Sequence, residues 1–167
     1  ECTNASLIEI IKKVIFSLEK IINEKISYFI WVNKNHNHAI KEGKYYIHRK
    51  GATPAKKGER GVIPANMKEG SFLVLGLGNK KFLESSSHGA GRKLSRSQAR
   101  KEINLSEFKQ EMKNIKGTVN KETLDEAPQA YKDIFEVMEK QKQSVKVLDQ
   151  IIPIINWKGT KRIPKSS

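Results

Sequence analysis

The sequence predicts an α+β fold in which short mixed strands are flanked by helices. Apolar residues recur at three- and four-residue steps in the first 30 residues and again in the second half, which is typical of helices. Between Tyr28 and Leu83 the apolar runs are short and are separated by Gly, Pro and Asn, which is typical of strands. With 167 residues, the chain is long enough for one modest domain or a piece of a larger one.

We expect three regions along the chain. Residues 1–30 form an amphipathic helical segment, residues 31–159 form the main folded region, and residues 160–167 form a polar tail. Because the chain opens at Glu1 and not at a methionine, we also expect it to be part of a longer protein.

The first element is a helix whose apolar residues run from Leu7 to Ile22 along one face, with Asn4 as its N-cap. Such a stripe predicts a packing or partner helix without chemistry of its own. Strands follow at Tyr45–Ile47, Val62–Ile63 and Phe72–Leu75.

Capping patterns place the later helices. Ser95 with Gln98, and Asn104 with Glu107, have the spacing of capping boxes. A third helix is expected to begin near Pro128, with one apolar face made of Tyr131, Ile134, Phe135 and Met138. The β-branched run Val145–Ile155 predicts a last strand.

The charge of the chain favours an anionic partner. There are 32 Lys and Arg against 18 Asp and Glu, a net charge of +14, and the sequence pI is about 9.8. Nucleic acid or a nucleotide is favoured over an acidic membrane surface, and a lysine-rich solvated surface remains the alternative. The charge is concentrated in Lys41–Arg60 and in Lys80–Lys101, which contain seven basic residues each.

The sequence excludes a secreted disulfide scaffold and a membrane-spanning protein. The only cysteine, Cys2, cannot form an intrachain disulfide, which points to a reducing compartment and a cytoplasmic location. Four lysines interrupt the apolar stretch from Leu7 to Phe29, so no membrane span is expected.

The segment Ser85–Arg96 is the strongest candidate for a phosphate site. It leads from a strand through small residues, which let a ligand approach the backbone closely, toward a helix. Arg92 and Arg96 lie four residues apart and can face one anion with forked donors. His88, at the turn, can serve as acid, base or nucleophile, and a structural role is the alternative.

Two further histidines, His36 and His38, are a candidate metal pair. On a strand, residues two apart point to the same face. A competent site usually needs three or four ligands, and the sequence contains neither CxxC nor HExxH, so we expect part of any metal site to come from elsewhere.

Three segments together resemble the C-terminal half of the RtcB family of GTP-dependent RNA ligases. They are Tyr46–Ala55 (YIHRKGATPA), Gly61–Phe72 (GVIPANMKEGSF) and Ser86–Arg92 (SSHGAGR). The resemblance runs from about Asn35, through Asp125–Lys132 (DEAPQAYK), to Lys158–Gly159, and it does not extend to residues 1–30.

The resemblance implies an activity. RtcB ligases use two Mn²⁺ ions and GTP to guanylylate a histidine, transfer GMP to an RNA 3′-phosphate, and join that end to a 5′-hydroxyl. By this resemblance His88 is the nucleophile, and a neutral imidazole suits that task because it attacks phosphorus at neutral pH and leaves readily.

The resemblance also implies site residues. Arg92 and Arg96 match arginines that hold the RNA terminal phosphate, and His36 matches a manganese ligand. The residues implied to bind the guanine nucleotide are Asn37, Pro64, Ala65, Asn66, Met67, Ser71, His88, Gly89, Ala90, Gly91, Tyr131 and Lys158. Ala65 stands where the family usually has glycine, and His38 is not a family ligand position.

The family's first half supplies an Asp-x-Gly-Cys-Gly segment and two more histidine ligands, and none of these is in this sequence. The implied partners are RNA with 3′-phosphate (or 2′,3′-cyclic phosphate) and 5′-hydroxyl ends, as in tRNA splicing or RNA repair, the missing N-terminal half, and an archease-like activator. Two rivals stay open: a non-catalytic remnant or RNA- and nucleotide-binding module, and a basic structural protein of a ribonucleoprotein particle.

Overall fold

The computed structural model describes residues 2–28 and 32–158, and it divides into two compact units, Glu1–Trp31 and Val32–Ser167. The predicted polar tail, residues 160–167, lies outside the described residues.

The first unit is built on helix α1 (Cys2–Ile22), which confirms the predicted helix. The helix begins at Cys2, so the prediction that Asn4 caps it was wrong: Asn4 lies within the first turns. The apolar side chains of Ile10, Val14 and Leu18 lie along it and are exposed. Among the described residues, no helix combines the length and the apolar character needed to cross a bilayer.

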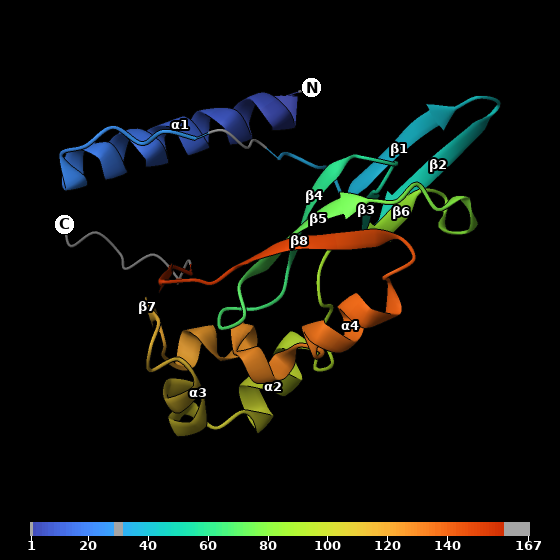
Figure 1. Ribbon diagram of the computed structural model, residues 1–167. Coiled ribbons are helices and arrows are strands. Elements are labelled where there is room, and N and C mark those ends of the chain that lie inside the picture. The colour runs from blue at the N-terminus through green and yellow to red at the C-terminus, as the bar shows by residue number, and fades with distance from the viewer. Residues whose placement is uncertain (1, 29–31, 159–167) are drawn as a thin grey trace. The chain divides into compact units, whose positions relative to one another are not determined.

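The second unit has the α+β fold that the sequence predicts (Figure 1). Its main sheet is antiparallel and has the strand order β4 (Arg60–Pro64), β5 (Ser71–Gly76), β8 (Val145–Ile151). Helix α4 (Ile134–Lys140) covers this sheet, because the buried side chains of Ile134 and Met138 pack with Phe72, Val74 and their neighbours.

A second core lies among short helices. Helices α2 (Arg96–Glu102) and α3 (Leu105–Glu111) are followed by the 3₁₀ helices η2 (Lys121–Glu126) and η3 (Pro128–Ala130). Phe108 of α3 is fully buried and packs with Met67, Met112, Leu124 and Ala127. The predicted capping box of Ser95 with Gln98 is present. Asn104 is the N-cap of α3 as predicted, but its side chain accepts from the backbone N–H of Ser106, so the predicted capping box with Glu107 is not formed.

The remaining strands form pairs. A hairpin joins β1 (Asn37–Glu42) to β2 (Tyr45–Lys50), and β3 (Ala52–Pro54) pairs with β6 (Ser85–Ser87). Strand β7 (Lys116–Gly117) runs parallel to β9 (Ile155–Asn156). A 3₁₀ turn, η1 (Lys80–Phe82), precedes β6.

The helix expected to begin near Pro128 begins later. Only one 3₁₀ turn follows Pro128, Tyr131 is extended, and α4 begins at Ile134 with Asp133 as its cap. Tyr131 is extended because it forms a β-bridge with Arg92, and this pairing overrides the helical pattern. Phe135, expected on the buried face, is 55% exposed.

The expected strand Val145–Ile155 is also divided. Strand β8 ends at Ile151, and Pro153, which has no backbone N–H to donate, separates it from β9.

Candidate nucleotide site

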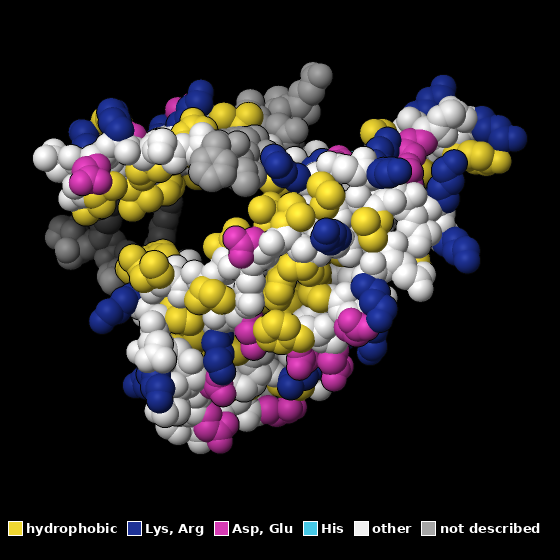
Figure 2. Space-filling model, in the orientation of Figure 1, with side chains coloured by type: hydrophobic (Ala, Val, Ile, Leu, Met, Phe, Trp, Pro, Cys, Tyr) yellow, Lys and Arg dark blue, Asp and Glu magenta, His cyan; other side chains and the backbone are white. Residues whose placement is uncertain are grey.

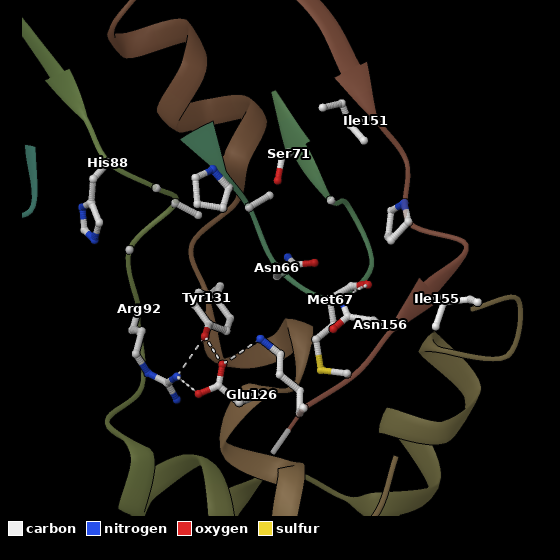
Figure 3. A pocket seen from close by; sticks show the side chains of 18 residues that line it. Asn66, Met67, Ser71, His88, Arg92, Glu126, Tyr131, Ile151, Ile155 and Asn156 are labelled. Atoms are coloured by element: carbon white, nitrogen blue, oxygen red, sulfur yellow. Dashed lines mark hydrogen bonds and ion pairs between the residues drawn. The ribbon is translucent and has the colours of Figure 1, made fainter. Parts of the chain in front are cut away.

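A pocket of about 760 Å³ lies where the two cores meet (Figure 3). Its walls come from four stretches far apart in the sequence: the β4–β5 turn, the loop after β6, the η2–η3 region and the β8–β9 segment. It brings together all the residues expected to bind the nucleotide except Asn37, namely Pro64, Ala65, Asn66, Met67, Ser71, His88, Gly89, Ala90, Gly91, Tyr131 and Lys158.

The β4–β5 turn is closed by its own backbone. The N–H of Ala65 donates to the carbonyl of Gly70 (2.8 Å), and the N–H of Gly70 donates to the carbonyl of Asn66 (3.0 Å). The left-handed residue of this turn is Gly70, with φ +76°, and not Ala65. An alanine at the position where the family usually has glycine is therefore compatible with this turn.

His88 is held by one backbone carbonyl. Its Nδ1 lies 2.7 Å from the oxygen of Gly51, and its own N–H donates to the same oxygen (3.3 Å). A carbonyl oxygen only accepts, so this contact assigns the proton of the neutral ring to Nδ1 and leaves the lone pair on Nε2. The ring is thus arranged to act through Nε2.

His36 is tied to the same peptide. The N–H of Gly51 donates to the carbonyl of His36 (3.0 Å), and the His36 ring stacks on His88 with ring centroids 5.0 Å apart and planes inclined by 11°. Gly51 itself has φ +72°, a backbone conformation that residues with a side chain rarely adopt. This single glycine therefore links the predicted metal ligand to the predicted nucleophile.

The described residues do not by themselves fit a manganese centre. No group of three or more His, Cys, Asp or Glu side chains converges there on a possible metal position. His36 stacks on His88, whereas His38 lies on β1 opposite Arg49 and its buried Nδ1 has no hydrogen-bond partner. The expectation that His36 and His38 form a metal-binding pair is thus not met, because the two side chains lie in different environments.

Glu126 organises the floor of the pocket. Its Oε2 accepts from the Tyr131 hydroxyl (2.7 Å) and lies 3.6 Å from Nζ of Lys158 (Figure 3). Burial opposes the charge on Glu126, but the hydrogen bonds from Tyr131 and Arg96 and the charge of Lys158 outweigh it, so the pKa of Glu126 lies below its ordinary value. Burial, together with the hydrogen bond to Glu126, raises the pKa of Tyr131.

The two arginines expected to bind an RNA phosphate already hold protein acceptors. Arg96 donates to Asp125 (2.6 Å) and to Glu126. Arg92 donates from Nε to the carbonyl of Leu94 (3.0 Å), from Nη1 to the Tyr131 hydroxyl (3.2 Å), and from Nη2 to the carbonyl of Asp125. Both arginines face one anion, but it is the carboxylate of Glu126, so any phosphate bound by these arginines would compete with Glu126 for them.

Several residues that line the pocket were not predicted from the sequence. Glu126 belongs to the motif that carries the resemblance, but no role was assigned to it. The other missed residues are Gly70, Ile151, Pro153, Ile155 and Asn156. Asn156 donates to the carbonyl of Met67 (3.3 Å), a contact between residues so far apart in the chain that no local pattern reports it.

The pocket has the size and lining of a small-molecule site. Apolar walls with a few placed polar groups, in a volume of roughly 300–1,000 Å³, are typical of such sites. Small residues along one wall (Gly89, Ala90, Gly91) leave the backbone accessible, as phosphate groups require. Fold and site together define an α+β domain with a pocket of small-molecule size and a histidine at the pocket's edge.

Comparison with known proteins gives the family. The family described as "tRNA-splicing ligase RtcB" matches residues 2–159, so this chain belongs to the RtcB family. The match includes α1, which the resemblance drawn from the sequence did not cover.

Two relatives show how the chain compares in length with curated RtcB proteins. It is 38% identical over 132 residues to the RNA-splicing ligase RtcB of Escherichia coli strain K12, covering 77% of this chain and 32% of that protein. It is 35% identical over 152 residues to the tRNA-splicing ligase RtcB of Nanoarchaeum equitans, covering 73% of this chain and 32% of that protein. The chain therefore spans about a third of the length of these curated relatives.

Proposed function

We propose that this chain is the guanylate-binding part of an RtcB-type RNA ligase, which joins RNA 3′-phosphate (or 2′,3′-cyclic phosphate) and 5′-hydroxyl ends through a histidine–GMP intermediate on His88. One observation carries the proposal. Residues that the resemblance assigns to the nucleotide, drawn from segments far apart in the sequence, line a single pocket with His88 among them.

The arrangement of His88 supports the nucleophilic role. With Nδ1 bound to the Gly51 carbonyl, the Nε2 lone pair is available to attack the α-phosphorus of GTP. An N–P bond forms, the bond to the β-phosphate oxygen breaks, and pyrophosphate leaves. An oxygen of the RNA 3′-phosphate then attacks the same phosphorus and displaces Nε2, and the 5′-hydroxyl of the second RNA end finally displaces GMP.

The pocket residues would bind and orient the nucleotide. Tyr131 and Lys158 flank the pocket beside Glu126, and the turn Pro64–Met67 with Ser71 forms the facing wall. The lowered pKa of Glu126 keeps a negative charge next to Lys158 at neutral pH, which fixes the lysine in place.

We place the rest of the active site in the portion that the longer relatives have and this chain does not match. Since the described residues supply His36 as the one predicted ligand, the two Mn²⁺ ions implied by the family need ligands from the other two thirds. RNA is the substrate class in the relatives' names, and tRNA splicing, RNA repair, an archease-like activator and a cytoplasmic location belong to the same proposal.

Guanylylation of His88 tests the proposal. The chain is incubated with radiolabelled GTP and Mn²⁺, with and without the N-terminal two thirds of a relative. We expect an acid-labile, base-stable GMP adduct in the complemented sample, lost in His88→Ala and retained in His38→Ala. An adduct that persists in His88→Ala would contradict the assignment.

A second candidate is an RNA- or nucleotide-binding module without ligase activity. The incomplete set of metal ligands among the described residues favours it. It predicts GMP binding to the pocket with no adduct on His88, even in the complemented sample.

A further inference from the structure

One face of the β1–β2 hairpin is basic and carries no acidic residue. Directly opposed residues of antiparallel strands point to the same side of the sheet. The pairs Asn37 with Lys50, Ala39 with His48, and Lys41 with Tyr46 therefore share one face, which we call the basic face. All six residues are exposed, and Tyr46 is 65% exposed.

The opposite face is turned toward the body of the unit. It carries the pairs His38 with Arg49, Ile40 with Ile47, and Glu42 with Tyr45. Arg49 is 3% exposed and anchors this face, since its Nε donates to Ser85 (2.9 Å) and its Nη2 donates to the carbonyl of Leu83 (3.1 Å). This anchor leaves the basic face toward solvent in the described unit.

The positive charges of the basic face have no protein partner. The acid of the hairpin, Glu42, lies on the opposite face and pairs there with Arg49 and Lys56. Among the described residues, neither Lys41 nor Lys50 forms an ion pair, so both charges are free to bind an external anion. Figure 1 shows the hairpin extending away from the main sheet, and Figure 2 shows Lys and Arg side chains gathered around it.

The basic face ends at the candidate site. The Asn37–Lys50 pair is its last pair, and the next residue, Gly51, accepts from His88 and donates to His36. From the Lys41–Tyr46 pair to this end, the strands span about 13 Å, at 3.3 Å per residue. The face thus carries one lysine near each end and one exposed aromatic ring, and it runs toward His88.

We infer that the basic face of the β1–β2 hairpin binds the single-stranded RNA end that is delivered to His88. Lys41 and Lys50 neutralise phosphates, and the Tyr46 ring stacks on a base. Lysines that track the backbone, combined with an exposed aromatic ring, are the arrangement by which proteins bind single strands. The inference rests on the proposed function for the identity of the ligand.

Salt dependence tests the two lysines. Binding of a fluorescently labelled single-stranded RNA with a 3′-phosphate to this 167-residue chain is followed by anisotropy at several salt concentrations. Each phosphate neutralised on a single strand contributes about 0.7 to the slope of log K against log salt. The double variant Lys41→Ala/Lys50→Ala should therefore lower the slope by about 1.4, and Lys109→Ala/Lys113→Ala, two exposed lysines of the α3 region, should lower it clearly less.

Stacking is tested by an adjacent pair of tyrosines. Tyr46→Ala should weaken RNA binding by about fivefold or more, and Tyr46→Phe should preserve it, because the ring is kept. Tyr45→Ala is the matched control: Tyr45 is also 65% exposed but lies on the opposite face, so its loss should leave the affinity unchanged. Circular dichroism confirms that each variant folds.

Each outcome decides between the two proposals. The inference is wrong if neither the lysine pair nor Tyr46 affects RNA binding, or if the parent chain does not bind RNA. The basic face would then be a candidate contact surface for a protein segment. Guanylylation of His88 in the complemented sample is then unaffected, and the proposed function stands. If the variants lose RNA affinity while His88 is never guanylylated, the RNA surface stands and the ligase proposal fails.

Discussion

At the scale of single residues, the buried carboxylate of Asp125 is one of the groups through which we expect the fold to respond to acid. Its side chain is 5% exposed and lies 2.6 Å from Nη1 of Arg96 and 3.2 Å from Nη2 of Arg100. Burial opposes its charge, but the hydrogen bonds from both arginines outweigh burial, so its pKa lies below the ordinary value.

The direction of this shift predicts acid destabilisation. A carboxyl with a lowered pKa contributes stability above its unfolded value of about 3.9, and this contribution is lost as the pH falls through the lower folded value. The free energy of unfolding, measured by urea denaturation, should decrease from about pH 5 to pH 3. Asp125→Asn should cost about 1–2 kcal/mol at pH 7 and flatten that decrease.

The matched control is Glu122→Gln, a substitution of an exposed acid in the same 3₁₀ helix. It should leave both the stability at pH 7 and its pH dependence close to those of the parent chain. An Asp125→Asn variant that follows the parent chain through the acid range would show that the ion pairs of Asp125 do not stabilise the fold.

The sequence identifies single residues well where a motif carries them. The histidine, the small residues after it and the turn at Pro64–Met67 were assigned from contiguous motifs, and the structure places them in one pocket, although their roles stay predictions. The role of Glu126 was not predictable in this way. It follows from contacts with Arg92, Arg96 and Lys158, which approach from separate parts of the chain.

At the scale of elements, the approach of the β4–β5 turn to the end of β8 shapes one wall of the pocket. Gly70 has φ +76°, and a Cβ built on it would collide with the carbonyl oxygen of Ile151 and lie 2.8 Å from Cδ of Pro153. Ile151 and Pro153 both line the pocket. We therefore predict that Gly70→Ala lowers stability by more than the 1–2 kcal/mol of left-handed strain and weakens GMP binding.

The control variant Gly58→Ala separates the cost of the left-handed backbone from the cost of a steric collision. Gly58 has φ +79°, but its Cβ would meet no atom within 4 Å. It should therefore show the cost of the left-handed conformation alone and leave GMP binding unchanged. Urea denaturation measures the free energy of unfolding of both variants, and calorimetric titration measures their affinity for GMP. Equal losses of stability and equal GMP affinities in the two variants would contradict the prediction.

Local sequence patterns predicted the helices and strands but not all of the residues at which they begin and end. Capping residues placed α2 and α3 correctly, because the cap bonds are made within a few residues of the chain. The start of α4 was wrong, since Tyr131 is extended by its pairing with Arg92, across a separation that no local pattern contains. The register of β8 against β5, which places Ile151 at the pocket, is likewise a long-range property.

At the scale of the whole molecule, this chain offers a nucleotide-sized pocket and His36 as the one predicted metal ligand, and it spans about a third of its relatives' length. Mn²⁺ ordinarily takes several oxygen or nitrogen ligands. We therefore predict that the 167-residue chain binds Mn²⁺ no more tightly than about millimolar, the weak end of the range for oxygen-ligated sites.

Calorimetric titration of the chain with Mn²⁺ measures this affinity, and His36→Ala should leave it unchanged, because a single imidazole cannot define a strong site. Addition of the N-terminal two thirds of a relative should restore tight binding, and His36→Ala should then weaken it. A stoichiometric, micromolar Mn²⁺ site in the chain alone would show that it holds further ligands, and would favour catalysis without a complementing N-terminal portion.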